Sequence, residues 1–238
     1  MTSVKEKIQL KRNIDIDLSG RCPMLCPMCW RQSDPIAKKQ GHDMTVDNFL
    51  KVIEFVQLGS VKGFIYFSGA LSDPIHHPKF IDFLKICADK NIYCEVQTAS
   101  SFKSKEWFIE AFKAHPKARW QFGIDGLPED SHKYRINQDG QKLFDIMVEA
   151  TKHLKTYPIW QYIVFKYNQD HVEYCKEWAK DIGCKFKLVL SGKTTDFFIE
   201  DFEKFIPTNK KYRIARNNDN DNLSQFQTYM NVVENEKE

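Results

Sequence analysis

The sequence predicts an α/β protein built as a partial (β/α)6 TIM-like barrel with parallel strands. Short apolar segments alternate strictly with longer segments of helical periodicity, which favours parallel strands joined by right-handed crossovers. Six such units fill roughly 190 residues, fewer than the roughly 250 that a complete eight-fold barrel takes. An open doubly wound sheet fits the same alternation and remains the alternative.

Each strand is expected where a short run of residues is apolar or alternates between apolar and polar. The first strand alternates (NIDIDLS), whereas the fifth (IWQYIVFK) is almost continuously apolar, as expected when both faces of a strand are buried. The six strands are expected at residues 13–19, 63–69, 92–98, 118–125, 159–166 and 186–191.

The helices are predicted by the spacing of their apolar residues and by the signals at their ends. Thr45 and Ser104 are expected N-caps, because a hydroxyl oxygen accepts a hydrogen bond from the first free backbone N–H groups of a helix. Gly183 is expected to close the last helix. The five helices are expected at residues 45–58, 79–91, 104–115, 141–155 and 170–183.

Three parts are expected along the chain: a core over residues 1–191, a helical extension over 192–215 and a flexible polar tail over 216–238. The tail has too few aliphatic residues to offset the entropy of ordering. The net charge of +3 gives no electrostatic footprint for nucleic acid. The sequence has no apolar run of membrane-spanning length and no signal-peptide pattern, so a cytoplasmic location with reduced thiols is expected.

Three cysteines, Cys22, Cys26 and Cys29, lie in RCPMLCPMCW with the spacing C-x3-C-x2-C. A structural zinc site needs four ligands, usually as two separated pairs, and no fourth ligand stands nearby. A redox C-x2-C pair would leave Cys22 unused and should open a helix, whereas the following segment, WRQSDPIAKKQGHD, is not expected to be helical. In a [4Fe–4S] cluster held by three thiolates, one iron stays open for a small molecule.

The triplet after the first strand resembles the signature of the radical S-adenosylmethionine (radical SAM) superfamily, and later segments follow the family order. FSGALSDPIHHPKF (67–80) is similar to the glycine-rich segment after the second strand, and TAS (98–100) takes the T-N-G position. FGIDGLPEDSHKYR (122–135) resembles the S-I-D-G…Y-R segment. The resemblance covers residues 13–191 and points to members with a SPASM extension, whose auxiliary-cluster part is expected to be missing because no cysteine follows Cys184.

This resemblance implies that Cys22, Cys26 and Cys29 hold a [4Fe–4S] cluster and that SAM chelates the open iron. Reductive cleavage of SAM would give a 5′-deoxyadenosyl radical that abstracts hydrogen from an unknown peptide or small-molecule substrate. A flavodoxin or a ferredoxin is the implied electron donor. The alternatives are a compact enzyme similar to 7-carboxy-7-deazaguanine synthases, and a non-catalytic module that binds a metal or a partner.

The resemblance also implies contacts with SAM. Ser68 and Gly69 end the second strand, where they would lie near the SAM amino group. Asp73 either orients that loop or meets the amino group itself. Asp125 is expected to accept hydrogen bonds from the ribose hydroxyls, and Arg135 to pair with the SAM carboxylate.

Two further residues complete the expected SAM site. Met28 stands where family members commonly place an aromatic residue near the adenine, and its soft sulfur suits such a contact. Thr98 ends the third strand, and both Thr98 and Gln161 are expected to point toward one face of the sheet. The chain departs from the family pattern at Ala99, which replaces the usual Asn, and at Gly123, which stands where a Ser is frequent. Neither departure removes a cluster ligand.

Overall fold

The computed structural model describes residues 11–33, 43–58, 61–69, 71–191 and 204–212. Within these residues, six strands form one sheet in the order β1-β2-β3-β4-β5-β6, and every neighbouring pair is parallel. This order has no reversal, as in a barrel wall, whereas a doubly wound sheet reverses its order at a switch point. The predicted partial (β/α)6 barrel is confirmed, and the doubly wound alternative does not fit this order.

The elements lie within five residues of the predicted ranges, and the largest differences are at the ends of β1 and α6. The strands are β1 (Lys11–Asp15), β2 (Val61–Phe67), β3 (Tyr93–Thr98), β4 (Arg119–Gly123), β5 (Ile159–Val164) and β6 (Lys185–Leu190). The α-helices are α1 (Trp30–Ser33), α3 (Val46–Gln57), α4 (Phe80–Asp89), α5 (Lys105–Ala114), α6 (Gly140–Ala150) and α7 (Val172–Asp181). The 3-10 turns are η1 (Pro74–His76), η2 (Pro128–Lys133), η3 (Gln169–His171) and η5 (Lys210–Tyr212).

The local end signals behave as the sequence predicts. Thr45 accepts a hydrogen bond from Asn48 N and so caps α3, and Ser104 accepts one from Trp107 N and caps α5, both at 3.2 Å. Gly183 follows α7 with a φ of 74°, a left-handed conformation that glycine adopts without strain.

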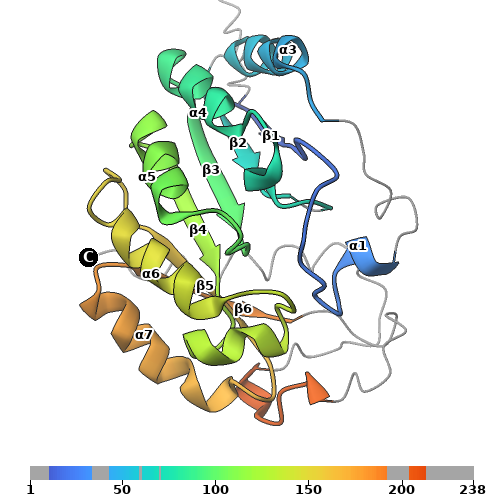
Figure 1. Ribbon diagram of the computed structural model, residues 1–238, viewed down its shortest axis with the longest axis vertical. Coiled ribbons are helices and arrows are strands. Elements are labelled where there is room, and N and C mark those ends of the chain that lie inside the picture. The colour runs from blue at the N-terminus through green and yellow to red at the C-terminus, as the bar shows by residue number, and fades with distance from the viewer. Residues whose placement is uncertain (1–10, 34–42, 59–60, 70, 192–203, 213–238) are drawn as a thin grey trace, which may run out of the picture.

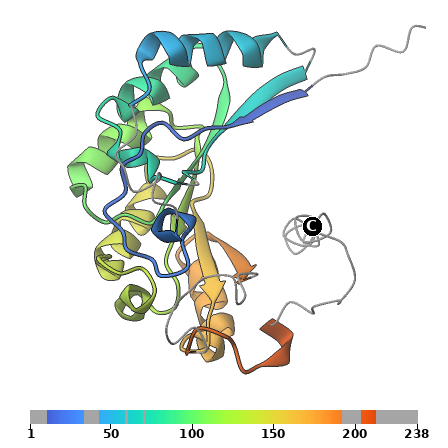
Figure 2. The same ribbon diagram turned by 90° about the vertical axis from the view of Figure 1, so that its right-hand side faces the viewer.

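The long helices cover one face of the sheet (Figures 1 and 2). Alternate residues of the central strands face these helices and form the main hydrophobic core, in which Trp120, Phe122 and Trp160 are fully buried. None of the helices in the described ranges has both the length and the apolar character needed to cross a bilayer. The residues that alternate with this apolar set point to the other face of the sheet.

The expectation that the segment after Cys29 is not helical is wrong for its first four residues. Trp30–Ser33 form the single turn α1, in which Gln32 N donates to Cys29 O at 2.8 Å. The Arg31 guanidinium fixes this turn by donating to the carbonyls of Gly20 and Leu71, at 2.5 and 2.9 Å. One isolated turn has little stability of its own, so these longer-range contacts explain why local periodicity did not reveal it. The rest of the segment, 34–42, lies outside the described residues.

The predicted extension, 192–215, is described at 204–212, and the predicted tail, 216–238, lies outside the described residues. Residues 204–212 carry the short turn η5, and the rest of the predicted extension, 192–203 and 213–215, lies outside the described residues. They dock on the loop after β5: Lys166 N donates to Phe205 O at 3.2 Å. The Phe205 and Tyr212 side chains are both buried.

Candidate active site

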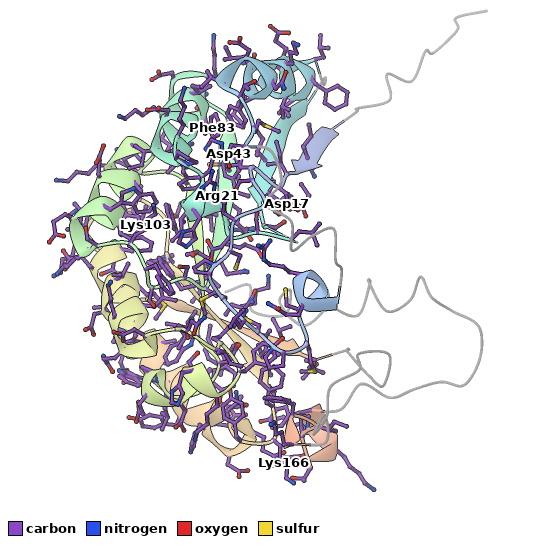
Figure 3. All side chains as sticks on the ribbon, turned by 45° about the vertical axis from the view of Figure 1, so that its right-hand side comes forward. Asp17, Arg21, Asp43, Phe83, Lys103 and Lys166 are labelled. Carbon is purple, nitrogen blue, oxygen red and sulfur yellow. The ribbon has the colours of Figure 1, made fainter. Side chains whose placement is uncertain are left out.

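The cysteine loop lies at the carboxyl edge of the sheet, between the loops that follow β2 and β4. On the β2 side, Asp73 N donates to Arg21 O at 2.9 Å, and on the β4 side Leu25 N donates to Ile136 O at 3.2 Å. The Arg21 guanidinium also forms a two-pronged ion pair with Asp43, with distances of 2.9 and 2.8 Å (Figure 3). The carboxyl edge is where barrel enzymes build their active sites.

The three cysteine side chains gather in a small hydrophobic cluster apart from the main core. Cys26 is 7% exposed, and Cys22 and Cys29 are half-buried. All seven cysteines are free thiols. The other members of the small cluster are Met24, Met28, Tyr134, Ile163, Phe165, Tyr167 and Phe205. The loop therefore holds three thiols together behind an apolar wall.

The thiols act on one another electrostatically. The pKa of the Cys22 thiol is raised to about 12, mainly by burial, with smaller contributions from Asp73, Cys26 and Cys29. Burial also raises the pKa of Cys26, while the charge and hydrogen bond of Arg135 lower it. Burial thus favours the protonated form of Cys22 and Cys26, whereas a bound metal deprotonates its cysteine ligands.

No three His, Cys, Asp or Glu side chains of the described residues converge to hold a single metal ion. A cubane cluster does not ask for such convergence, because each thiolate binds a different iron. Cys22, Cys26 and Cys29 come from one loop, interact electrostatically and are partly shielded from water. This donor set fits three of the four iron positions of a [4Fe–4S] cluster.

A buried ion pair stands beside the thiols. Asp125 is fully buried, and its Oδ2 accepts from Arg135 Nε at 2.7 Å while its Oδ1 accepts from Ile163 N at 2.7 Å. Burial lowers the pKa of Arg135, but Asp125 and Cys26 raise it by more, so the guanidinium stays charged. Burial raises the pKa of Asp125, and Arg135 opposes that rise. Arg135 therefore links Asp125 to the Cys26 thiol.

Asp73 holds the loop after β3. Its Oδ2 accepts three hydrogen bonds, from Thr98 Oγ1, Ala99 N and Ser100 N, at 2.9, 3.0 and 3.1 Å. Its Oδ1 accepts a longer one from Ile75 N at 3.4 Å. Burial raises the pKa of this carboxyl to about 6, and these hydrogen bonds oppose the rise. Only the Ile75 contact lies within the loop after β2 that Asp73 was expected to orient, and the hold on the β3 loop was not expected.

The turn after β2 depends on Gly69. Its φ is 59°, and a Cβ at this position would overlap the Ser72 carbonyl, so a side chain here would force the turn open. Ser68 donates its hydroxyl hydrogen to Asp15 Oδ1, which ties the end of β2 to the end of β1. Ser72 makes a similar bond to Asp17 Oδ1 at 2.8 Å (Asp17 is labelled in Figure 3).

Residues 16–179 match the family model of the radical SAM superfamily. The chain belongs to the radical SAM superfamily. The members of this superfamily use a [4Fe–4S] cluster and SAM, which agrees with the three thiols and with the loops that surround them.

Solved structures of radical SAM proteins share the fold. SuiB from Streptococcus suis bound to S-adenosylmethionine aligns with a TM-score of 0.65 at 10% identity, over 94% of this chain and 47% of SuiB. Methylornithine synthase (PylB) aligns with a TM-score of 0.57 at 8% identity, over 79% of this chain and 58% of PylB. The histidine-tagged protein anSMEcpe with bound AdoMet aligns with a TM-score of 0.56 at 16% identity, over 78% and 52% of the two chains.

At identities this low, the similarity concerns the fold. SuiB has also been solved bound to its precursor peptide SuiA, and that structure aligns with a TM-score of 0.62 at 9% identity, over 76% of this chain and 39% of SuiB. This radical SAM chain spans less than half of the length of SuiB. No curated protein sequence matches the chain at a significant level.

The expected site residues of this radical SAM chain form two groups. Cys26, Met28, Arg135 and Asp125 lie together with the other two cysteines. Met28 is 1% exposed and thus buried inside this group. The second group is held by Asp73 and includes Thr98, with Ser68 and Gly69 in the neighbouring turn. The contacts of all these residues with SAM stay predictions.

The expectation that Thr98 and Gln161 point toward one face is wrong. Thr98 is in register with Phe122, whose partner on β5 is Trp160, so Thr98 lies on the helix-covered face. Gln161 is in register with Gly123 and lies on the opposite face. Because the side-chain period of a strand is two, an offset of one position in register reverses the face.

Sequence reasoning also missed contacts that close the thiol group. Tyr134, Phe165 and Phe205 pack together around the cysteines, with Tyr134 and Phe165 ring centroids 4.3 Å apart. Phe205 lies far along the chain from the cysteines, so no local pattern could reveal it. The departure at Gly123 has a local reason: a Cβ there would lie 3.1 Å from the Arg135 guanidinium.

Proposed function

We propose that this chain is an enzyme that cleaves SAM reductively and uses the resulting radical on a substrate. The observation that carries the proposal is the group of three free thiols on the loop after β1, with the charged Arg135 beside Cys26. A bound [4Fe–4S] cluster and SAM supply the chemistry, in which one electron cleaves SAM to methionine and a 5′-deoxyadenosyl radical that abstracts hydrogen.

In this proposal the residues of the chain bind, orient and exclude water. Cys22, Cys26 and Cys29 provide the three cluster thiolates. Arg135 stabilises the thiolate of Cys26 and pairs with the SAM carboxylate through the guanidinium N–H groups that Asp125 does not use. The apolar side chains around the thiols keep water from the radical.

Asp125 and Asp73 hold the surrounding residues in place through hydrogen bonds. Asp125 fixes the guanidinium of Arg135, and its expected contact with the SAM ribose remains part of the proposal. Asp73 holds the backbone of Ala99 and Ser100, so the loop after β3 keeps one shape near the proposed SAM site.

The substrate is proposed to be a peptide or a small molecule with an abstractable hydrogen. The electron comes from a low-potential donor of the flavodoxin or ferredoxin class. A reducing compartment such as the cytoplasm suits both the thiols and this donor.

The test is SAM cleavage by the anaerobically reconstituted protein. Adding SAM should change the electron paramagnetic resonance spectrum of the dithionite-reduced cluster, and 5′-deoxyadenosine should form slowly even without substrate. A fully loaded, reducible cluster that neither responds to SAM nor cleaves it would refute the proposal in favour of a non-catalytic module.

Arg135→Ala sharpens this test. A charge-assisted hydrogen bond contributes about 1.5–3 kcal/mol, so its loss should weaken SAM binding about ten- to a hundredfold. Lys133→Ala is the matched control, because this exposed lysine lies two residues away and pairs with Asp130 on the surface. SAM binding that is equal in the two variants would remove Arg135 from the proposed site.

A further inference from the structure

Polar side chains line the face of the sheet that the helices leave uncovered. Gln161 is in register with Gly123 on one side and with Lys187 on the other, so these three positions share this face. Gln121 precedes Gly123 by two residues and therefore points the same way. On strands whose other face is apolar, these polar residues are not part of the main core.

A chain of hydrogen bonds joins three of these side chains. Lys187 Nζ donates to Gln121 Oε1 at 2.9 Å, and Gln121 Nε2 donates to Gln161 Oε1 at 2.5 Å. An ammonium group only donates, so the atom that faces it on Gln121 is the oxygen. The Gln121 nitrogen must then face the Gln161 oxygen. The chain of bonds therefore leaves the Gln161 N–H groups and the remaining Lys187 N–H groups as donors.

Lys187 forms no direct ion pair with a carboxylate of the described residues. Its contact is the neutral amide of Gln121, which is 1% exposed. Glu95, the nearby carboxylate on this face, already accepts from Arg119 and Gln97. If these residues had only a structural role, a carboxylate would be expected next to this half-buried charge, because an unpaired ammonium away from water is costly. Burial lowers the pKa of Lys187, and the charge of the nearby Glu95 opposes this only in part.

The donors lie next to the cysteine site. Gly123, two strands away from Lys187, has the Arg135 guanidinium over its open side. Neighbouring strands are about 4.8 Å apart, so Lys187 and Gly123 are about 10 Å apart across the sheet. A small molecule held by Lys187 would thus reach toward Arg135 and Cys26.

We propose that Lys187 and Gln161 bind a carboxylate group of the substrate. A carboxylate offers one negative charge and two acceptor oxygens, which match one ammonium and one amide N–H donor. This assignment rests on the proposed function, because it places the substrate of that reaction. It narrows the substrate to carboxylate-bearing molecules and gives Gln121 the role of a positioning residue.

The experiment measures protection of Lys187 in the reconstituted, SAM-loaded protein. N-acetoxysuccinimide acetylates accessible amines, and mass spectrometry gives the rate at each lysine. The probes are glutarate and its neutral analogue glutaramide. With glutarate at about ten times its dissociation constant, acetylation of Lys187 should slow about tenfold. The exposed Lys185 on the same strand should keep its rate, and glutaramide should protect neither lysine.

Variants separate charge from shape. Lys187→Met keeps the side-chain length and should abolish glutarate binding measured by calorimetry, whereas the control Lys185→Met should leave it unchanged. Gln161→Leu should weaken glutarate binding about ten- to a hundredfold, as for one hydrogen bond to a charged group.

Several results would overturn the assignment. Equal protection by glutarate and glutaramide, or no protection up to about 100 mM glutarate, far above the millimolar affinity of a weak site, would remove the carboxylate site. Loss of SAM binding in Lys187→Met would assign this ammonium to the carboxylate of SAM instead. SAM cleavage is assayed on the same preparation: if cleavage fails while glutarate still protects Lys187, the proposed function is wrong and the carboxylate site stands.

Discussion

The three loop cysteines and the four other cysteines of this chain occupy different surroundings. Cys87, Cys94 and Cys175 are fully buried in the main hydrophobic core, and Cys184 lies at its margin. The loop cysteines sit in a separate cluster, where a guanidinium meets one thiol and the thiols interact with one another. A buried cysteine behaves as a small apolar residue, whereas at Cys26 the charge of Arg135 opposes the rise in pKa that burial causes.

The largest expected effect tests this difference directly. Cys26→Ala, Cys22→Ala or Cys29→Ala should abolish the cluster, because each thiolate fills one iron position. The wild-type protein should bind close to four irons and four sulfides after anaerobic reconstitution, the stoichiometry of a cubane. Cys87→Ala and Cys175→Ala should retain the full iron and sulfide content. Tight zinc binding without iron–sulfur absorption would contradict the assignment of the loop cysteines as cluster ligands.

The second effect concerns the charge beside the loop. Asp125→Ala leaves Arg135 without its buried partner, so the free energy of unfolding should fall by about 3–5 kcal/mol in urea titrations of the cluster-free protein. Asp130→Ala breaks the more exposed pair with Lys133 and should cost at most about 1 kcal/mol. Equal losses in the two variants would show that Asp125 does not set the environment of the thiols.

A third test compares a core cysteine with a loop cysteine by the free energy of unfolding. Cys87→Ser places a hydroxyl in the apolar core and should lower the free energy of unfolding by about 1–3 kcal/mol. Cys22→Ser, in a half-buried loop, should change the free energy of unfolding of the cluster-free protein by about 0.5 kcal/mol or less. The reverse order in urea titrations would mean that Cys22, and not Cys87, is the packing residue.

The smallest effect is a pH profile. The pKa of Cys22 is raised to about 12 by burial, with Asp73 adding to the rise, so its thiol stays protonated through neutral pH. Because the thiolate is the reactive form, alkylation of Cys22 in the cluster-free protein should still rise about tenfold per pH unit between about pH 8 and 10. An ordinary thiol levels off near its pKa of about 8.5, and such a plateau at Cys22 would contradict the raised pKa.

Much of the fold was readable from the sequence. The order of strands and helices followed from periodicity, and Thr45 and Ser104 showed where two helices begin. These signals are local, because periodicity and capping depend on residues within a few positions of one another. The spacing of the three cysteines likewise belongs to one loop, so the sequence alone indicated the thiol group.

Other features depended on residues that are distant in the chain. The turn α1 forms because Arg31 reaches the Leu71 carbonyl, and the wall of the thiol cluster includes Phe205. Neither contact leaves a periodic trace in the sequence. The role of Asp73 as the acceptor that holds the β3 loop was not predicted, because its partners Thr98, Ala99 and Ser100 are about 25 residues away in the chain.

The direction in which each strand residue points separates what the sequence determined from what only the tertiary structure decided. The sequence by itself determined that neighbouring residues of β4 and β5 point to opposite faces of the sheet, because the side-chain period of a strand is two. It did not determine that Thr98 turns toward the helices while Gln161 joins Lys187 on the other face. That choice belongs to the register between strands, which the packing of the whole sheet against its helices fixes, because a shift of one residue would bury the polar set and expose the apolar one.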